Sequence, residues 1–153
     1  MEFTVKNQFS YMRRSRVAAL QILYQLEFYP DKNFTDIATR LYKLYERDYP
    51  EKKVSELLNK DFIIQLVTYV QERPAEITEL LEPELLESWD LHEISMILRL
   101  ILFLAIAEFK QTDTDLAVII NEYIEITKAY ENERDARFVN SILEILGKKI
   151  RNN

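Results

Sequence analysis

The side chains near the amino end that are best suited to binding chemistry are three arginines within four residues, Arg13, Arg14 and Arg16. They follow Ser10, a residue type that favours the N-cap of a helix. The first backbone N–H groups of a helix point outward and attract anions, as the guanidinium groups also do. The pattern therefore predicts a helix start that binds phosphate.

A second group near the carboxyl end combines an aromatic ring with cations and an amide. Phe138 follows Arg134 and Arg137 and precedes Asn140. Proteins bind single-stranded RNA with such sets, in which the ring stacks on a base, the cations hold phosphates and the amide reads a base edge. Phe138 also continues the apolar stripe of the last predicted helix, so spacing alone favours a core position over a stacking role.

Other kinds of chemistry are poorly supported by the composition. The single glycine, Gly147, excludes glycine-rich phosphate loops, and the lack of cysteine excludes disulfides, thiolate catalysis and cysteine-based zinc sites. The single histidine, His92, is best explained as a surface residue near a helix end. Acid pairs such as Glu122 with Glu125 are typical of a solvated helix face. We therefore predict no catalytic residue, no metal site and no cofactor.

The charge is unevenly distributed along the 153 residues, whose net charge is −6. Residues 1–16 and residues 134–153 each carry +3, so the segment between them carries −12. If the two basic ends meet, they form one cationic patch on an acidic protein, and such a patch attracts a polyanion to one place. The alternative is that both ends are only solvated.

The elements that position these residues are predicted to be helices. Apolar residues recur at helical spacing, and four prolines separate the periodic segments. The pattern predicts an all-α protein of about seven helices, with a break at 74–83 between two halves that share a core. Helices are expected over 11–28, 34–48, 54–73, 92–110, 115–129 and 134–149, with short helices after Pro74 and Pro83.

The most apolar segment, residues 94–109, contains Arg99 and Glu108 and is shorter than the roughly 20 residues of a membrane span. It is therefore predicted to be a buried core helix, and the chain is expected to be cytoplasmic, without contact to a membrane. A buried guanidinium needs a partner. Our first candidate for an ion pair with Arg99 is Glu122, and Glu108 is the second.

Three stretches of the sequence resemble a known family. They are RRSRVAALQILYQLE at 13–27, WDLHEISMILRLILFLAIAEF at 89–109 and AVIINEYIEITKAYENERDARFVNSIL at 117–143. Their order and spacing over residues 12–150 resemble those of the NusB family of transcription antitermination factors. Trp89, Arg99 and Glu108 fall where that family keeps the same residue types.

The resemblance implies a fold and a function. The fold would be two perpendicular three-helix bundles that share a core, formed by one domain at 12–150 after an N-terminal extension at 1–11. The function would be binding of the single-stranded RNA element boxA together with the ribosomal protein NusE, within the RNA polymerase antitermination complex on ribosomal RNA operons. No enzyme activity is implied.

The resemblance also assigns residues. Tyr24 falls where the family uses a tyrosine near the ribosomal-protein contact. Two departures concern the second RNA segment, where Arg134 replaces an often acidic residue and the loop 130–133 lacks the family's glycine. RNA contacts are implied for Arg13, Arg14, Arg16, Arg137 and Phe138, with Arg134 expected to strengthen them.

Two alternatives remain beside this interpretation. A similar fold forms the RNA-binding part of ribosomal RNA cytosine methyltransferases, but no glycine-rich cofactor loop is present, so we expect no such enzyme here. The other alternative is a helical scaffold or homodimer of the same fold that uses another RNA or protein partner.

Overall fold

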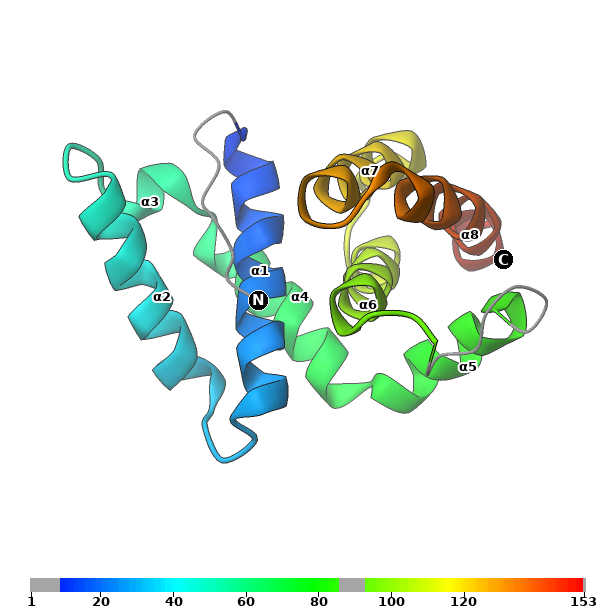
Figure 1. Ribbon diagram of the computed structural model, residues 1–153, viewed down its shortest axis with the longest axis horizontal. Helices are drawn as coiled ribbons and strands as arrows, with labels where there is room; N and C mark the ends of the chain where they lie inside the picture. Colours follow the sequence, from blue (N-terminus) through cyan, green and yellow to red (C-terminus); the bar gives the residue numbers. More distant parts are fainter. Residues whose placement is uncertain (1–8, 86–92, 153) are drawn as a thin grey trace. The chain divides into compact units, whose positions relative to one another are not determined.

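The computed structural model describes residues 9–85 and 93–152, which form eight helices and contain no strand in those ranges (Figure 1). The all-α prediction is therefore confirmed. The chain divides into two compact units, Met1–Val67 and Thr68–Asn153, and each is described by itself below. Trp89, His92 and residues 1–8 of the predicted extension lie outside the described residues.

The first unit is built around α1, which packs against α2 and α3. The predicted N-cap is confirmed, since Ser10 Oγ accepts the backbone N–H of Arg13 at 3.3 Å. Ser15 lies inside the unit, where its hydroxyl accepts the backbone N–H of Asn59 at 2.9 Å and so ties α1 to the chain before α4. The helices of this unit are α1 (Tyr11–Phe28), α2 (Phe34–Asp48), α3 (Val54–Leu57) and the first turns of α4 (Lys60–Glu72).

The helix predicted over 54–73 is interrupted, and this prediction was wrong. Leu58 is extended, with φ −135° and ψ 140°, and Asn59 caps the next helix by accepting the N–H of Phe62 at 3.0 Å. Leu57 and Leu58 are both 1% exposed. The break therefore lets two consecutive leucines enter the core. In an uninterrupted helix, the side chains of two consecutive residues would point in different directions.

The second unit is centred on α6, which packs against α5, α7 and α8. Ser95 Oγ caps α6 by accepting the N–H of Leu98 at 3.1 Å. Most of α6 is buried, as its nearly uniform apolar character predicts. The helices of this unit are α5 (Pro74–Leu85), α6 (Met96–Gln111), α7 (Leu116–Tyr130) and α8 (Glu133–Arg151).

The prolines do not mark the division that we expected. Pro74 begins α5 as expected, but Pro83 lies inside its last turn, and most of the short helix expected after Pro83 lies outside the described residues. The boundary between the units falls inside α4, between Val67 and Thr68, instead of at 74–83. The reason is that the two ends of α4 make contacts in different units. The ring of Phe62 lies beside Arg16 of the first unit, whereas the hydroxyl of Tyr69 donates to Glu76 of the second unit.

Two features of α8 hold it close to the other helices of its unit. A Cβ on buried Gly147 would lie 3.2 Å from Leu116 Cδ2 and 3.3 Å from Phe109 Cζ, so the only glycine allows a close approach. Farther along, Arg151 donates from Nε to the carbonyl of Phe109 and from Nη2 to the carbonyl of Thr112, each at 2.9 Å. These carbonyls belong to the end of α6 and the residue that follows it, where helices leave acceptors without partners.

Candidate nucleic-acid interface

The start of α1 presents two of the three predicted arginines near the surface. Arg13 and Arg14 are half-buried. The guanidinium carbon of Arg13 lies 5.7 Å from the centre of the Phe9 ring, and Arg14 donates from Nε to the carbonyl of Leu57 at 3.1 Å. Arg14 also donates from Nη1 to the carbonyl of Phe9. Both guanidinium groups are thus held in place beside the first turn, whose N–H groups favour an anion.

Arg16 has a different environment from its two neighbours. It is 3% exposed, and its guanidinium carbon lies 5.4 Å from the centre of the Phe62 ring. This arrangement stabilises the packing of α1 against α4 through a cation–π contact. Contact between Arg16 and a phosphate stays a prediction, and it requires the side chain to leave this buried position.

The start of α8 combines surface cations with a partly accessible ring. Asn132 caps the helix by accepting the N–H of Asp135 at 2.8 Å, which replaces the missing loop glycine with a two-residue connection from α7. Arg134 and Arg137 are exposed, and Phe138 is half-buried. Phe138 is therefore neither fully buried nor fully exposed, and it lies close in sequence to both cations.

The basic carboxyl end contributes less free charge than its composition suggests. Arg151 is bound to backbone carbonyls at the end of α6, and Lys149 forms an ion pair with Glu84 of α5. Lys148 is exposed and lies on the groove described below. Two of the cations in this +3 segment therefore stabilise the second unit. That the two basic ends of the chain form one cationic patch stays a prediction.

The predicted partner residue, Tyr24, is half-buried on α1. Its ring centroid lies 4.9 Å from that of Phe28, with the planes tilted by 58°. Leu20 and Leu23 on the same helix are buried, so Tyr24 lies at the margin of the apolar face rather than at its centre. The position allows a role at a surface, and partner binding stays a prediction.

Arg99 is half-buried in α6, with its guanidinium carbon 5.7 Å from the centre of the Phe103 ring. Its predicted partner Glu122 is also half-buried, on α7, and their ion pair stays a prediction. The second candidate, Glu108, is fully buried and accepts a hydrogen bond of 2.9 Å from the hydroxyl of Tyr123. This buried pair joins α6 to α7.

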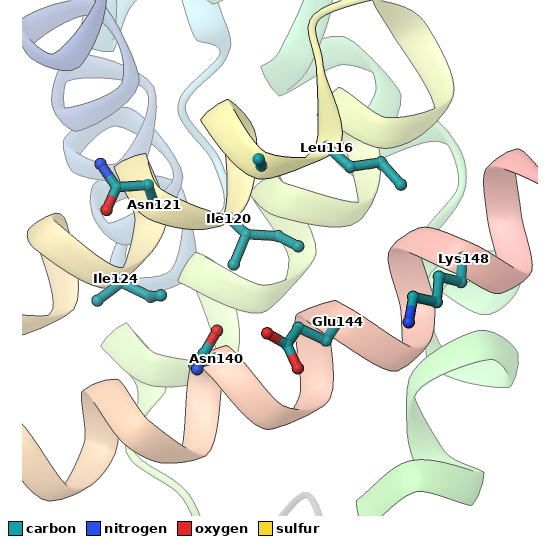
Figure 2. Close-up of a pocket in the computed structure, with 8 residues that line it drawn as sticks. Leu116, Ile120, Asn121, Ile124, Asn140, Glu144 and Lys148 are labelled. Atoms are coloured by element: carbon teal, nitrogen blue, oxygen red, sulfur yellow. The ribbon is translucent and has the colours of Figure 1, made fainter.

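Sequence reasoning missed a groove between α7 and α8 (Figure 2). Its volume is about 450 Å³. One wall is apolar and carries Leu116, Ile120 and Ile124 at intervals of four residues, and the facing wall carries Asn140 and Glu144 (Figure 2). The spacing of four on each helix was visible in the sequence, but which two helix faces meet is a property of the tertiary structure.

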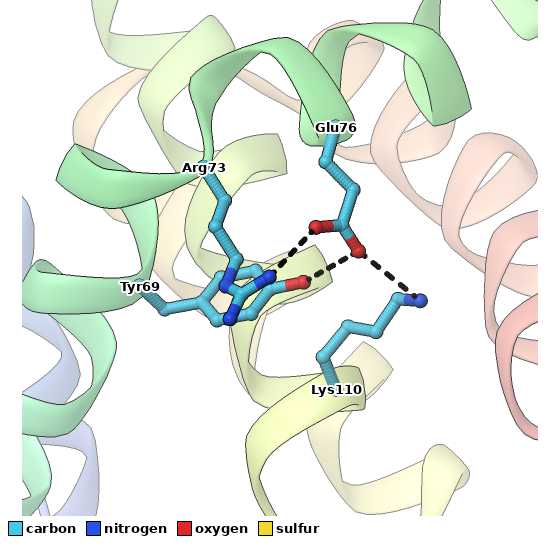
Figure 3. Close-up of polar contacts among 4 residues, drawn as sticks. All are labelled: Tyr69, Arg73, Glu76 and Lys110. Atoms are coloured by element: carbon cyan, nitrogen blue, oxygen red, sulfur yellow. Dashed lines mark hydrogen bonds and ion pairs between the residues drawn. The ribbon is translucent and has the colours of Figure 1, made fainter.

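A second polar cluster was also missed (Figure 3). Glu76, at the start of α5, accepts a hydrogen bond from the Tyr69 hydroxyl at 3.1 Å and one from Arg73 Nη1 at 3.4 Å, and it lies 3.6 Å from Lys110 Nζ. Partial removal of water acts to raise the pKa of Glu76, but these donors and cations prevail and lower it. Burial of the ring, together with the same carboxylate, raises the pKa of Tyr69.

Within residues 9–85 and 93–152, no group of three histidine, cysteine, aspartate or glutamate side chains is arranged to hold a metal ion. In the same part of the chain, no helix combines the length and apolar character that crossing a membrane requires.

The fold and the candidate site define a class: a protein of two units whose described residues form helices only, and whose helices α1 and α8 each begin with arginines that are close in sequence to a phenylalanine. The chain belongs to the NusB family, because the sequence profile of that family matches residues 13–148.

Individual relatives agree with this assignment. The transcription antitermination protein NusB of Bartonella quintana is 30% identical over 142 residues, which cover 90% of this chain and 88% of the relative. The same protein of Leptospira biflexa is 33% identical over 137 residues, which cover 89% of this chain and 91% of the relative.

Solved structures agree as well. The chain is similar to T. maritima NusB with a TM-score of 0.72 and 30% identity, over 92% of both chains. A chain in the "Crystal Structure of a Plectonemic RNA Supercoil" has a TM-score of 0.67 over 92% of this chain, but its 18% identity supports the fold alone.

Proposed function

We propose that this protein binds the boxA element of ribosomal RNA transcripts as a single strand, together with the ribosomal protein NusE. In this role it acts in the bacterial cytoplasm as a binding subunit of the RNA polymerase antitermination complex, without catalysing a reaction. The proposal draws on the family membership over residues 13–148. The observation that carries the RNA part is half-buried Phe138, which directly follows exposed Arg137 and lies four residues after exposed Arg134 on α8.

Each group at the start of α8 has a separate task in this proposal. The accessible part of the Phe138 ring stacks on a base, and the guanidinium groups of Arg134 and Arg137 hold adjacent phosphates. The neighbouring carboxylates of Glu133 and Asp135 repel phosphate, so the strand is expected to follow the two arginines rather than cross the helix end.

The start of α1 supplies the second set of phosphate contacts. Arg13 and Arg14 are half-buried and lie beside Phe9, and in this proposal their guanidinium groups bind phosphate beside the first helical turn. Arg16 joins them only after leaving the ring of Phe62. Tyr24, farther along α1, contacts NusE in this proposal, so RNA and protein use different parts of one helix.

Salt dependence tests the RNA part directly. With three or four phosphates neutralised on a single strand, log K falls with log salt at a slope of about −2 to −3. A fourfold increase in salt then weakens boxA binding by roughly 15- to 60-fold. Arg134→Gln with Arg137→Gln should reduce the steepness of the slope by about 1.4, because each lost phosphate contact removes about 0.7.

A matched control removes the same charge elsewhere. Arg40→Gln with Lys43→Gln changes two exposed cations on α2 and should leave the slope as in the wild type. Phe138→Ala should cost about 1–3 kcal/mol of binding free energy if its ring stacks on a base. Circular dichroism verifies that each variant is folded. If the α8 double variant keeps the wild-type slope, the RNA binds elsewhere, and if the wild type binds no boxA RNA, the helical scaffold or homodimer is the better explanation.

A further inference from the structure

One side of α8 carries a row of four polar side chains that begins at one of the proposed RNA contacts. The members of the row are three or four residues apart, a spacing that places them on the same side of a helix. They are Arg137, Asn140, Glu144 and Lys148. The last three line the groove between α7 and α8 (Figure 2). An RNA strand that is held at Arg137 therefore has this groove directly beside its path along α8.

The two walls of the groove match the two kinds of surface on a nucleobase. Leu116, Ile120 and Ile124 of α7 form an apolar wall, against which the flat face of a base can pack. On the facing wall, Asn140 and Glu144 offer an amide and a carboxylate to the polar edge of the base (Figure 2). The volume of about 450 Å³ lies within the range of roughly 300–1,000 Å³ that is common for small-molecule sites.

The packing of the second unit does not use these polar groups. Among residues 9–85 and 93–152, the side chains of Asn140 and Glu144 form no hydrogen bond or ion pair with one another or with a neighbour. Glu144 is exposed and Asn140 is half-buried. By contrast, the carboxylate of buried Glu108 accepts a hydrogen bond from Tyr123. The amide and the carboxylate on the groove are therefore available to a ligand.

The charges along the row determine which part of an RNA strand each position attracts. The carboxylate of Glu144 repels phosphate, so the part of the strand beside it is a base rather than the backbone. Cations stand on both sides of it, at Arg137 and Lys148, and both are exposed. They are eleven residues apart, or about 16 Å along α8 at roughly 1.5 Å per residue. The row thus offers phosphate contacts at its ends and a base contact between them.

We infer that the groove between α7 and α8 binds one guanine base of the RNA strand. The two oxygens of Glu144 accept the N1–H and an N2–H of guanine, and the amide of Asn140 donates to its O6. Guanine is the only one of the four common bases whose pairing edge carries two adjacent N–H donors, and a carboxylate accepts such a pair through both oxygens. The inference rests on the proposed function, because the strand must first be held at the start of α8.

The experiment measures, by fluorescence anisotropy at one salt concentration, the binding of labelled oligouridine 12-mers. One strand contains uridine only, a second has guanosine at its centre, and a third has inosine there. The wild type should bind the guanosine strand about tenfold more tightly than the uridine strand, because a bidentate contact discriminates between bases to this extent. Inosine keeps N1–H and O6 but lacks the N2 amino group, so its advantage over uridine should be only about threefold.

Two variants assign this preference to the groove. Glu144→Gln should reduce the preference for guanosine to less than about threefold, since the amide keeps only one acceptor oxygen. Asn140→Leu should reduce it as well, because the donor to O6 is lost. The matched control is Glu79→Gln, which removes an exposed carboxylate from α5 of the same unit and should keep the full preference. Circular dichroism verifies that each variant is folded.

The outcomes separate this inference from the proposed function. If the wild type binds boxA RNA but does not prefer guanosine, or if Glu144→Gln keeps the full preference, the inference is wrong while the proposed function stands. If the wild type binds neither boxA RNA nor any of the three 12-mers, the proposed function fails and the inference fails with it.

Discussion

Replacing Arg151 with methionine should destabilise the second unit more than any other change to the basic carboxyl end. The guanidinium donates to the carbonyls of Phe109, Thr112 and Thr114, with distances of 2.9 Å to the first two. A hydrogen bond to a charged group contributes about 1.5–3 kcal/mol, but the half-buried site lets water replace part of what is lost. We therefore expect Arg151→Met to lower the free energy of unfolding by about 2–4 kcal/mol.

Urea unfolding followed by circular dichroism measures this loss. With a denaturant slope of roughly 2 kcal/mol per molar urea, the midpoint should fall by about 1–2 M. Lys148→Met is the matched control, because it removes an exposed cation from the same helix and should shift the midpoint by less than about 0.3 M. Arg151→Lys keeps the charge near the end of α8 but lacks the planar fork, so it should recover only part of the stability.

The reasoning would be refuted if Arg151→Met unfolded at the same urea concentration as Lys148→Met. Such a result would mean that water satisfies the carbonyls at the end of α6 as well as the guanidinium does. If Arg151→Lys matched the wild type, the charge alone would be responsible, and the three directed hydrogen bonds would contribute little.

The remaining predictions concern the core, pH dependence and partner binding. Arg99→Met should destabilise the protein by roughly 3 kcal/mol, and a double-mutant cycle with Glu122→Gln should give a coupling of about 1–3 kcal/mol; no coupling would disprove the ion pair. The pKa of Glu76 is lowered in the folded protein, so its stabilising effect is present above its ordinary pKa and is lost as pH falls through the lowered value. Thermal melting from pH 7 to pH 3 should therefore show a smaller loss for Glu76→Gln than for the wild type, and equal losses would contradict the assignment. Tyr24→Ala should weaken NusE binding without loss of helicity or boxA binding, whereas loss of helicity would identify Tyr24 as a core residue.

The sequence by itself determined which segments are helical and where several of them begin. Apolar spacing predicted α1 and α2 with the observed bounds, and Ser10 identified the first N-cap. These features are local, because a helix and its cap depend on residues within four positions of each other. The break at Leu58 escaped the same reasoning, since periodicity does not reveal that two consecutive leucines enter one core.

Which charged groups are available for binding was decided only by the tertiary structure. Arg16 is buried against Phe62, and Arg151 reaches the end of α6 near Phe109, about forty residues away in the chain. The net charge of the sequence includes these two buried or half-buried arginines in the same way as exposed Arg134 and Arg137, so it does not show which of them can bind a ligand. A guanidinium loses its freedom to bind a ligand when a ring or a set of carbonyls from a distant segment surrounds it, and that neighbour is specified by the packing of helices rather than by local sequence.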